Sequence, residues 1–437
     1  MLSERNKLVS IMSKNYVNAS KKDKGLILDS LIRILGYSRK YASCLLNKSV
    51  KTVKLDGSGL TLKADPGKKH FRKREKIYGE EIRVIILFLW RTFDYICSDR
   101  LHSMLPYQIK KMEQFMHLYK NEWDDRDIKL TDTVKCKLKQ ISISTIERMI
   151  SVERKRYKIK GFSHTKPGSL LKDHIQIRTF AQWNENRPGF TEIDLVGHEG
   201  GNNYGEFCFT LDMTDIQTGW TETEAVRNKA QINVFKALKD IRDRLPFPLK
   251  GIDSDNGAEF INGEMVRYCE QEKITFTRGR KNYKNDQCYV EQKNWSIVRK
   301  YVGYARYDSI DELNIINELY KHLRLFTNYF LPVMQMQEKL RIGAFVKKRY
   351  DTPRTPYQRI LESPHVSLKD KEQLIKTYQT LNPFELKKRI RYFQIKLREV
   401  RRRKEFDQLH YQDKIKNVNF QKEKLSEEMN KDLHPYF

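Results

Sequence analysis

The hydrophobic pattern of this chain changes near Phe190, and that change most constrains its fold. Upstream, apolar residues recur at helical spacing, whereas residues 190–196 (FTEIDLV) form the short, partly alternating run typical of a strand. The pattern then predicts strands over 205–213 and 219–225, a helix over 229–245, a strand over 249–254, a helix over 263–272, a strand over 274–278 and a long helix from Asp286. This order predicts a central α/β domain with a mixed five-stranded sheet and helices.

The N-terminal third is expected to be all-helical. Over 24–48, apolar residues at helical spacing run to Gly36, and Ser38 is placed to cap a second, basic helix. A helix, a short glycine turn and a basic helix outline a helix-turn-helix, in which Arg39 and Lys40 would contact DNA. A packed helical hairpin with no DNA-binding role is the alternative.

A second helical segment is predicted over residues 78–162, with an interruption at Leu105-Pro106. Ser144 and Glu147 have the spacing of a capping box, so a helix is expected to begin there. This helix is a candidate for a second DNA-recognition helix, because a run of Lys and Arg follows it directly.

The C-terminal region is also expected to be helical and basic. A heptad seam predicts a short coiled coil or a docked helix, and its members are Leu386, Ile390, Phe393, Leu397 and Val400. Such a helix would dimerise, bind DNA or pack on its own domain. The polar tail from Asn417 is expected to be loose.

The net charge of the chain indicates what kind of molecule it binds. The 437 residues contain 84 Lys and Arg against 56 Asp and Glu, which gives a net charge of +28. Such an excess attracts polyanions and favours nucleic acid. The six Cys have no zinc-ligand spacing and are expected to be free thiols. Because no apolar signal segment or membrane span is found, a soluble cytoplasmic, nucleoid-associated protein is expected.

Three acids occupy positions in the predicted strands and helix from which their side chains would converge on one cleft. Asp194 lies inside the first strand, Asp255 directly follows the fourth, and Glu291 lies early in the long helix. An acid within an apolar strand is costly unless it is paired or binds a metal. Asp253 would face the same way as Asp255, but the Asn-Gly after Asp255 favours Asp255. Glu192 is expected to face away from Asp194.

The segment 254–260 (SDNGAEF), the earlier T-x-D strand and the 35 residues between Asp255 and Glu291 (positions 256–290) resemble the D,D-35-E core of retroviral integrases and bacterial insertion-sequence transposases. The resemblance covers residues 190–304 well. It implies a ribonuclease-H-like fold, with Asp194, Asp255 and Glu291 as catalytic ligands of Mg²⁺, for which Mn²⁺ substitutes. The zinc module of retroviral integrases has no counterpart here.

The resemblance further implies DNA contacts near the acids. Lys293 and Arg299 share the helix of Glu291. The preceding segment corresponds to a mobile loop of the family, and its candidate contacts are Arg278, Arg280, Lys281 and Lys284.

The predicted domains are a helix-turn-helix segment (1–62), a basic linker (63–77), a second helical DNA-binding segment (78–162), a linker (163–186), the ribonuclease-H-like core (187–305) and a helical basic region (306–437). The predicted function is a DNA transposase that cleaves and joins phosphodiester bonds by two-metal-ion catalysis. It would act on element ends and target DNA as a homodimer or larger assembly. A transposase-derived regulator without activity, or a hydrolytic nuclease of the same fold, are the alternatives.

Overall fold

The computed structural model describes residues 2–48, 52–54, 61–63, 77–115, 129–154, 176–177, 187–255, 257, 259–260, 263–279, 288–342 and 345–432.

The second and third helices of the chain begin at residues that can cap them. Ser20 accepts from the Asp23 amide at the start of α2 (Lys21–Leu35), and Gly36 (φ 68°) ends that helix. Ser38 Oγ accepts from the Tyr41 amide, 3.4 Å away, at the start of α3 (Arg39–Lys48), as expected.

The chain divides into two compact units, Met1–Ile77 and Tyr78–Phe437. In the first unit, α1 (Leu2–Asn18) was not anticipated, because its sequence is largely polar; it packs with α2 and α3 around a small core that includes Leu31 and Leu46. A short antiparallel hairpin follows, formed by β1 (Thr52–Lys54) and β2 (Thr61–Lys63), so the prediction that the N-terminal third is all-helical is wrong.

Four helices open the second unit: α4 (Glu80–Thr92), α5 (Ser98–Phe115), α6 (Asp132–Gln140) and α7 (Ile143–Arg154). The predicted break at Pro106 is wrong, because α5 runs through that residue. The chain turns instead at Asp94 and Tyr95, which both adopt φ of 60°. The capping box predicted at Ser144 is also wrong: Ser142 begins α7, where its Oγ accepts from the Thr145 amide at 3.3 Å.

The central sheet is mixed and contains the five predicted strands plus a two-residue edge strand. The strands are β3 (Gln176–Ile177), β4 (Phe190–Gly197), β5 (Phe209–Asp215), β6 (Thr221–Val226), β7 (Gly251–Ser254) and β8 (Thr275–Arg278). Their order is β3-β8-β7-β4-β5-β6, with β4, β5 and β6 antiparallel and β7 and β8 parallel to β4. The described sheet is therefore mixed, as the sequence predicts.

The two faces of the sheet differ sharply in polarity. On one face, Ile193, Leu211 and Ile252 pack with α8 (Gln231–Arg242) and α9 (Gly263–Gln271) in an apolar cluster. The opposite face carries polar side chains and contacts α10 (Cys288–Lys293), which continues through η3 (Asn294–Arg299) into α11 (Lys300–Val302). The six residues of η3 are π-helical, a conformation that is rare and often found at functional sites.

Helix α12 (Ile310–Phe330) closes the edge of the sheet at β6. Asn317 exchanges hydrogen bonds with the backbone of Ala225 (2.7 and 3.0 Å), and Asn328 does the same with Thr221 (2.9 and 2.8 Å). These side-chain amides pair with backbone groups at the edge of β6. An unpaired strand edge is a template for aggregation, so the contacts protect this edge.

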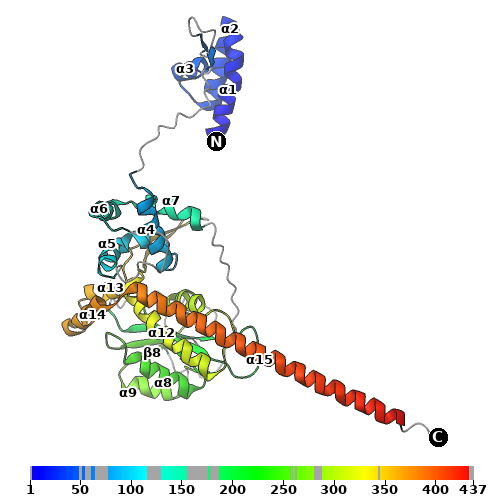
Figure 1. Ribbon diagram of the computed structural model, residues 1–437. Helices are drawn as coiled ribbons and strands as arrows, with labels where there is room; N and C mark the ends of the chain where they lie inside the picture. The colour runs from blue at the N-terminus through cyan, green and yellow to red at the C-terminus, as the bar shows by residue number, and fades with distance from the viewer. Residues whose placement is uncertain are drawn as a thin grey trace. The chain divides into compact units, whose positions relative to one another are not determined.

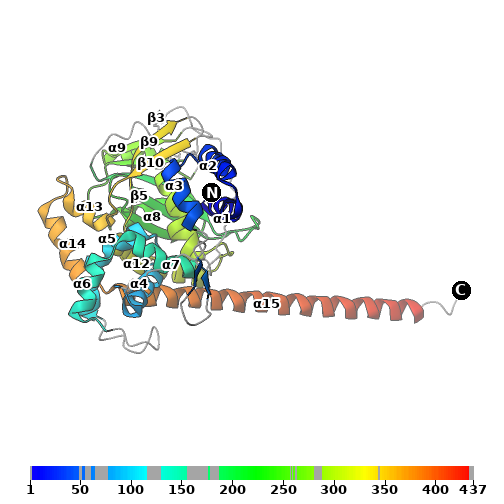
Figure 2. The ribbon, with the colours of Figure 1, turned by 90° about the horizontal axis from the view of Figure 1, so that it is seen from above.

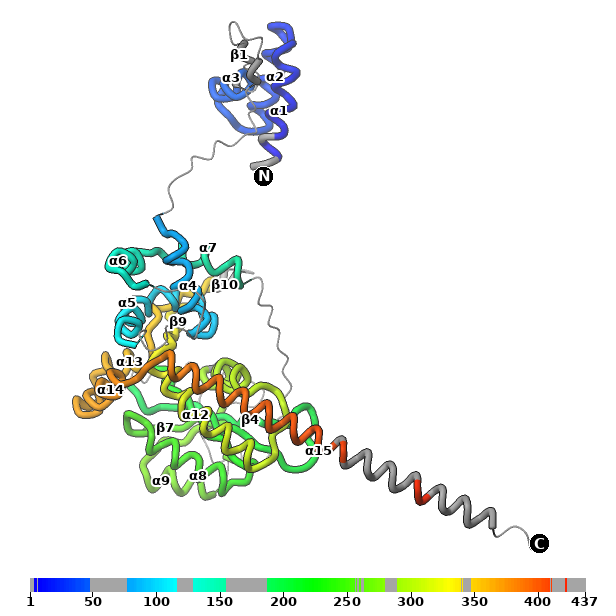
Figure 3. Tube along the Cα trace, in the orientation of Figure 1, coloured from blue at the N-terminus to red at the C-terminus, as the bar shows by residue number. Residues whose placement is uncertain are grey.

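The C-terminal region contains more than helices. A hairpin of β9 (Met336–Ile342) and β10 (Phe345–Tyr350), which the sequence analysis missed, precedes α13 (Pro356–Glu362) and α14 (Leu368–Thr380). Helices α13 and α14 lie beside α5 (Figures 1 and 2). Helix α15 (Pro383–Asp432) begins alongside α12 (Figure 3) and includes the residues from Asn417 that were expected to be loose.

The heptad seam of α15 is used inside the chain. Leu386, Ile390 and Leu397 are buried in the large core cluster of the second unit, and Phe393 and Val400 pack against it. Of the predicted alternatives, the docked helix is the one observed. None of the helices that the structure describes has an apolar stretch long enough to cross a membrane. The described cysteine side chains, those of Cys44, Cys97, Cys136, Cys208 and Cys269, are free thiols.

Candidate active site

Two of the three predicted acids lie side by side, with Asp194 inside β4 and Asp255 directly after the end of β7. Strands β4 and β7 run parallel with Ile193 opposite Ser254, so the next residue of each strand, Asp194 and Asp255, lies at the same edge. The Asp255 side chain is held by the backbone that follows it, because its Oδ1 accepts from the Gly257 amide at 2.8 Å. Burial and the nearby Asp194 carboxylate raise the pKa of Asp255 to about 6. The two carboxylates therefore repel each other in a poorly solvated place.

The Asp194 carboxylate is held at both oxygens. Its Oδ1 accepts from the Leu195 amide at 2.8 Å, and its Oδ2 accepts from Nδ2 of Asn294 at 2.5 Å. Burial raises the pKa of Asp194, and the charge of Glu259 adds to the rise. Asn294 was not predicted as a site residue, although it lies one helical turn beyond Glu291, a spacing that places both on one helix face.

Glu259 is a second residue that the sequence analysis left out. Its charge raises the pKa of both Asp194 and Asp255, so its carboxylate lies close enough to repel both carboxylates electrostatically. The signal was present in the segment 254–260, where Glu259 follows the Asn-Gly turn after Asp255.

Glu291 lies on α10 with an exposed side chain. Its charge raises the pKa of Glu192, which places it near the strand that carries Asp194. Across the residues that the structure describes, however, no three His, Cys, Asp or Glu side chains are grouped closely enough to hold a metal ion. The structure thus joins two of the predicted acids and leaves the third on the adjacent helix.

Asp194 also belongs to a layer of acids on the polar face of the sheet, whose other three members are fully buried. We call Glu192, Asp194, Asp212 and Asp253 the acid layer; they are neighbours across the paired strands, with Glu192 opposite Asp253 and Asp194 opposite Asp212. The expectation that Glu192 faces away from Asp194 is wrong, because residues two apart in a strand share a face.

Glu192 fixes the start of the helix that carries Glu291. Its Oε2 accepts from the amides of Tyr289 (2.8 Å) and Val290 (2.9 Å), where the first turn of α10 has no partners of its own. Burial raises the pKa of Glu192 to about 8, with smaller contributions from Asp253 and Glu291. Asp253, the alternative to Asp255, lies inside the fold and accepts from Thr277 Oγ1 at 2.6 Å.

Lys293 is turned into the protein. Its Nζ donates to the Gly219 carbonyl at 3.2 Å, and its charge opposes the strong rise that burial causes in the pKa of Asp212. Burial lowers the pKa of Lys293 itself to about 8. This position gives Lys293 a role beside the acid layer and offers no support for the predicted phosphate contact.

The other predicted DNA contacts are scattered. Arg278 is buried, and Arg299 stacks over the ring of Tyr304 with 5.0 Å to its centroid. Arg39 pairs with Asp29 on the surface of α3, and Lys40 beside it is exposed. The remaining members of the set, Arg280, Lys281 and Lys284, lie outside the described residues.

His198, which follows β4, does not reach the cleft. It is fully buried, and its Nε2 lies 2.8 Å from Thr210 Oγ1, which in turn lies 2.8 Å from the Tyr320 hydroxyl. Burial lowers the pKa of His198 to about 3, so its ring stays neutral. Trp220 is a core aromatic, whereas Trp295 on η3 is 53% exposed.

Comparisons with known proteins place the chain among relatives. No known family profile matches it. The catalytic core of BIV integrase is similar at 16% identity, covering 40% of this chain and 96% of that one, with a TM-score of 0.27. The HTLV-2 integrase core, solved in complex with magnesium, is similar at 15% identity, covering 33% and 90%, with a TM-score of 0.26.

A sequence relative is much nearer. The uncharacterized protein y4rM of Sinorhizobium fredii (strain NBRC 101917 / NGR234) is 35% identical over 360 residues, which are 82% of this chain and 95% of y4rM. An identity of this size over nearly the whole relative is shared by homologous proteins of one architecture. The chain belongs to the same protein family as y4rM.

Proposed function

We propose that this chain is a DNA transposase that cleaves and joins phosphodiester bonds at Asp194, Asp255 and Glu291. The observation that carries the proposal is the adjacency of Asp194, inside β4, and Asp255, directly after the parallel strand β7, beside the helix that bears Glu291. The 35-residue spacing between Asp255 and Glu291 supports the assignment of the third acid.

The residues at this edge fit a divalent cation. Their ligand atoms are carboxylate oxygens, which Mg²⁺ prefers. Asp194 and Asp255 also raise each other's energy when both are charged, and a cation between them would remove that repulsion. Asp194 and Asp255 would hold the ion, with Glu291 completing the set. A bound Mg²⁺ or Mn²⁺ would supply Lewis-acid stabilisation of the reacting phosphate and its entering and leaving oxygens.

The chain's own residues have separate tasks in this proposal. Asn294 orients the Asp194 carboxylate through its hydrogen bond, and Glu192 fixes the first turn of α10 and thereby Glu291. Water, and then a DNA 3′-hydroxyl, would attack phosphorus at the same edge. No side chain is needed as a covalent nucleophile.

DNA would be bound by the helical segments that precede and follow the sheet in the sequence. The exposed basic start of α3 and the net charge of +28 support a polyanionic partner. Two element ends and a target must meet in one reaction, so we propose an assembly of at least two copies on DNA.

The test is metal-dependent nicking of labelled DNA taken from just outside the gene. The full chain is compared with Asp255→Asn and Glu291→Gln, and with the exposed acids Asp240→Asn and Glu264→Gln as matched controls. Specific nicking in Mg²⁺ or Mn²⁺ that only the first pair abolishes, with DNA binding retained, is the expected result.

Two other outcomes would replace the proposal. Tight binding of that DNA with no nicking in either metal would favour a DNA-binding regulator. Nicking without strand joining, when a 3′-hydroxyl end and a target duplex are supplied, would favour a hydrolytic nuclease.

A further inference from the structure

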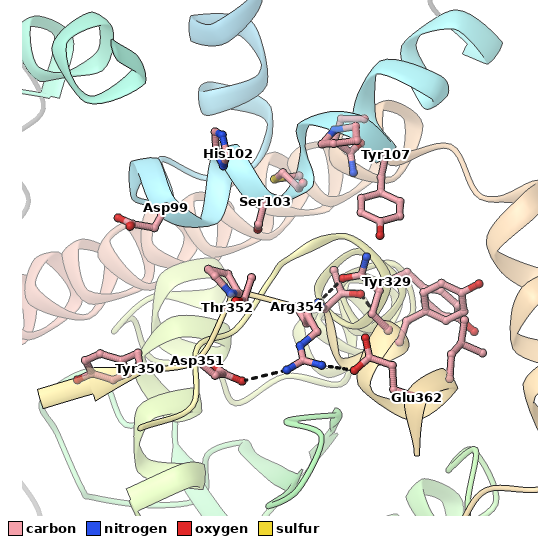
Figure 4. Close-up of a pocket in the computed structure, with 18 of the residues that line it drawn as sticks. Asp99, His102, Ser103, Tyr107, Tyr329, Tyr350, Asp351, Thr352, Arg354 and Glu362 are labelled. Carbon is pink, nitrogen blue, oxygen red and sulfur yellow. Dashed lines mark hydrogen bonds and ion pairs between the residues drawn. The ribbon is translucent and has the colours of Figure 1, made fainter. Parts of the chain in front are cut away.

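A large pocket lies between α5 and the segment that joins β10 to α13. None of the three predicted catalytic acids lines it. Its volume is about 810 Å³, within the range of small-molecule sites. In Figure 4, Asp99, His102 and Tyr107 of α5 face Tyr350 and Arg354 across the opening. We call this site the tyrosine pocket; its tyrosines are Tyr107, Tyr329, Tyr350, Tyr357 and Tyr378.

The walls of the tyrosine pocket are fixed from both sides. At one end of α5, Arg100 Nε donates to the Pro332 carbonyl. At the other end, Lys111 Nζ donates to the carbonyls of Tyr378 (2.7 Å) and Leu381 (3.0 Å), which are left open where α14 ends. Because these bonds join segments more than 200 residues apart, the pocket is preformed and a ligand need not order it.

The pocket offers aromatic faces to a planar ligand. Tyr329, Tyr357 and Tyr378 form a packed cluster, with Tyr357 and Tyr378 stacked at 4.8 Å between centroids. Tyr107 and Tyr350 at the opening are 47% and 45% exposed. Exposed tyrosine rings are the usual stacking partners of unpaired nucleobases.

The polar groups of the pocket accept hydrogen bonds more readily than they bind anions. Gln108 is 2% exposed, and its Oε1 has no hydrogen-bond partner among the described residues. Asp99 adds an exposed carboxylate. The Arg354 guanidinium is already paired with Asp351 and Glu362. The site therefore suits a neutral ligand with N–H donors and disfavours a phosphate.

A basic strand leads to the opening. Lys347, Lys348 and Arg349 of β10 are exposed and directly precede Tyr350. Arg349 lies 3.7 Å from Glu338 on the paired strand, and the two exposed lysines can contact phosphates. A DNA backbone that follows β10 would thus bring a base to the rings of the pocket.

We propose that the tyrosine pocket binds a nucleobase unstacked from DNA, with a preference for a base that carries an exocyclic amino group. Tyr107 and Tyr350 stack on the base, and Gln108 Oε1 accepts from its amino group. The proposal rests on the proposed function in that DNA is the ligand. It adds a second contact that does not involve the acids.

The first experiment uses the full chain in Ca²⁺ and duplexes with one unpaired nucleotide: adenine, thymine or an abasic residue. An unpaired base needs little energy to leave the stack, so pocket binding is measured directly. We expect the adenine duplex to bind about tenfold more tightly than the abasic one, a factor typical of one stacking contact.

Variants separate the two contacts. Tyr107→Ala should remove most of the preference for a base over the abasic residue, while Tyr204→Ala, a substitution at another exposed tyrosine, should leave it unchanged. Gln108→Leu should make adenine and thymine bind alike. Because Gln108 is buried, thermal unfolding of that variant is measured in parallel, and Tyr107→Ala alone remains decisive if the Gln108 variant does not fold.

Photocrosslinking locates the base. A 5-iodocytosine at the unpaired position, which carries an exocyclic amino group, should crosslink to Tyr107 or Tyr350. Equal affinities for the three duplexes, or crosslinks elsewhere in the chain, would overturn the proposal and favour a protein segment as the occupant. If DNA is bound and nicked normally in that case, only the pocket proposal fails; if no duplex binds at all, the proposed function fails with it.

Discussion

Asn294 Nδ2 lies 2.5 Å from Oδ2 of Asp194, so an amide on the π-helical segment holds the carboxylate of the central strand. The Oδ1 of Asn294 is buried without a hydrogen-bond partner among the described residues. The amide therefore has few alternatives to this contact, and the direction in which Asp194 presents its other oxygen depends on it.

Replacing Asn294 by Ala should weaken metal-dependent nicking without removing DNA binding. Loss of a residue that orients a metal ligand typically costs about 10- to 100-fold in metal affinity or activity. The measurement is the nicking rate against Mg²⁺ concentration, with Asn314→Ala on the exposed side of α12 as the control. An unchanged metal dependence in Asn294→Ala would remove Asn294 from the site.

Acid should destabilise the fold through His198. The pKa of its buried ring is lowered to about 3, against about 6.5 for an exposed histidine, so below pH 6.5 the unfolded chain takes up a proton that the folded chain refuses. Stability should therefore fall by about 1.4 kcal/mol per pH unit from this group as the pH drops below 6.5, and be unaffected by it above.

Urea unfolding at pH 7 and pH 5 measures this effect. The wild type should lose about 2 kcal/mol more than His198→Gln over that interval, whereas His365→Gln, at an exposed histidine, should behave as the wild type. Parallel pH curves for the wild type and His198→Gln would show that His198 is not the group responsible.

Ile390→Ala should lower the free energy of unfolding without changing the oligomeric state. Ile390 is fully buried in the core that α12 and α15 share, and such truncations cost about 2–5 kcal/mol. Ile395→Ala, at an exposed position of the same helix, should cost within about 0.5 kcal/mol. Sedimentation of both variants on and off DNA checks the second half; dissociation caused by Ile390→Ala would mean that the seam joins two copies.

The central sheet was predictable because its signals are local. The strands between Phe190 and Arg278 have apolar runs bounded by glycine, proline and aspartate, and the structure contains all five. Their ends differ from the prediction by a few residues; β5, for example, runs from Phe209 to Asp215. The helix ends at Gly36 and Ser38 were predictable for the same reason, since each of these residues acts only on the adjacent helix end.

The turn before α5 could not be read in the same way. The Asp94 carboxylate accepts from Lys387 and from the Tyr301 hydroxyl, and its carbonyl accepts from Lys300 at 2.9 Å. These partners are more than 200 residues away and hold Asp94 in a left-handed conformation that its neighbours do not dictate. Local rules placed the break at Pro106 instead.

The arrangement of the candidate site could be predicted only in part. The sequence indicates Asp194, Asp255 and Glu291 by type and spacing, and these assignments stay predictions. Lys293 ends α10 and Asn294 begins the π-helical η3, so the helical register changes directly after Lys293. A regular helical spacing cannot anticipate that change.

The acid layer sets a limit on how stable this fold can be. Burial raises the pKa of Glu192, Asp194 and Asp212, so each would be easier to fold as an amide or an aliphatic side chain. A search for thermostable variants of this chain should therefore return substitutions in the layer itself. Those variants would gain heat resistance by giving up the site, which is the conflict between robustness and activity that preorganised charge creates in a protein interior.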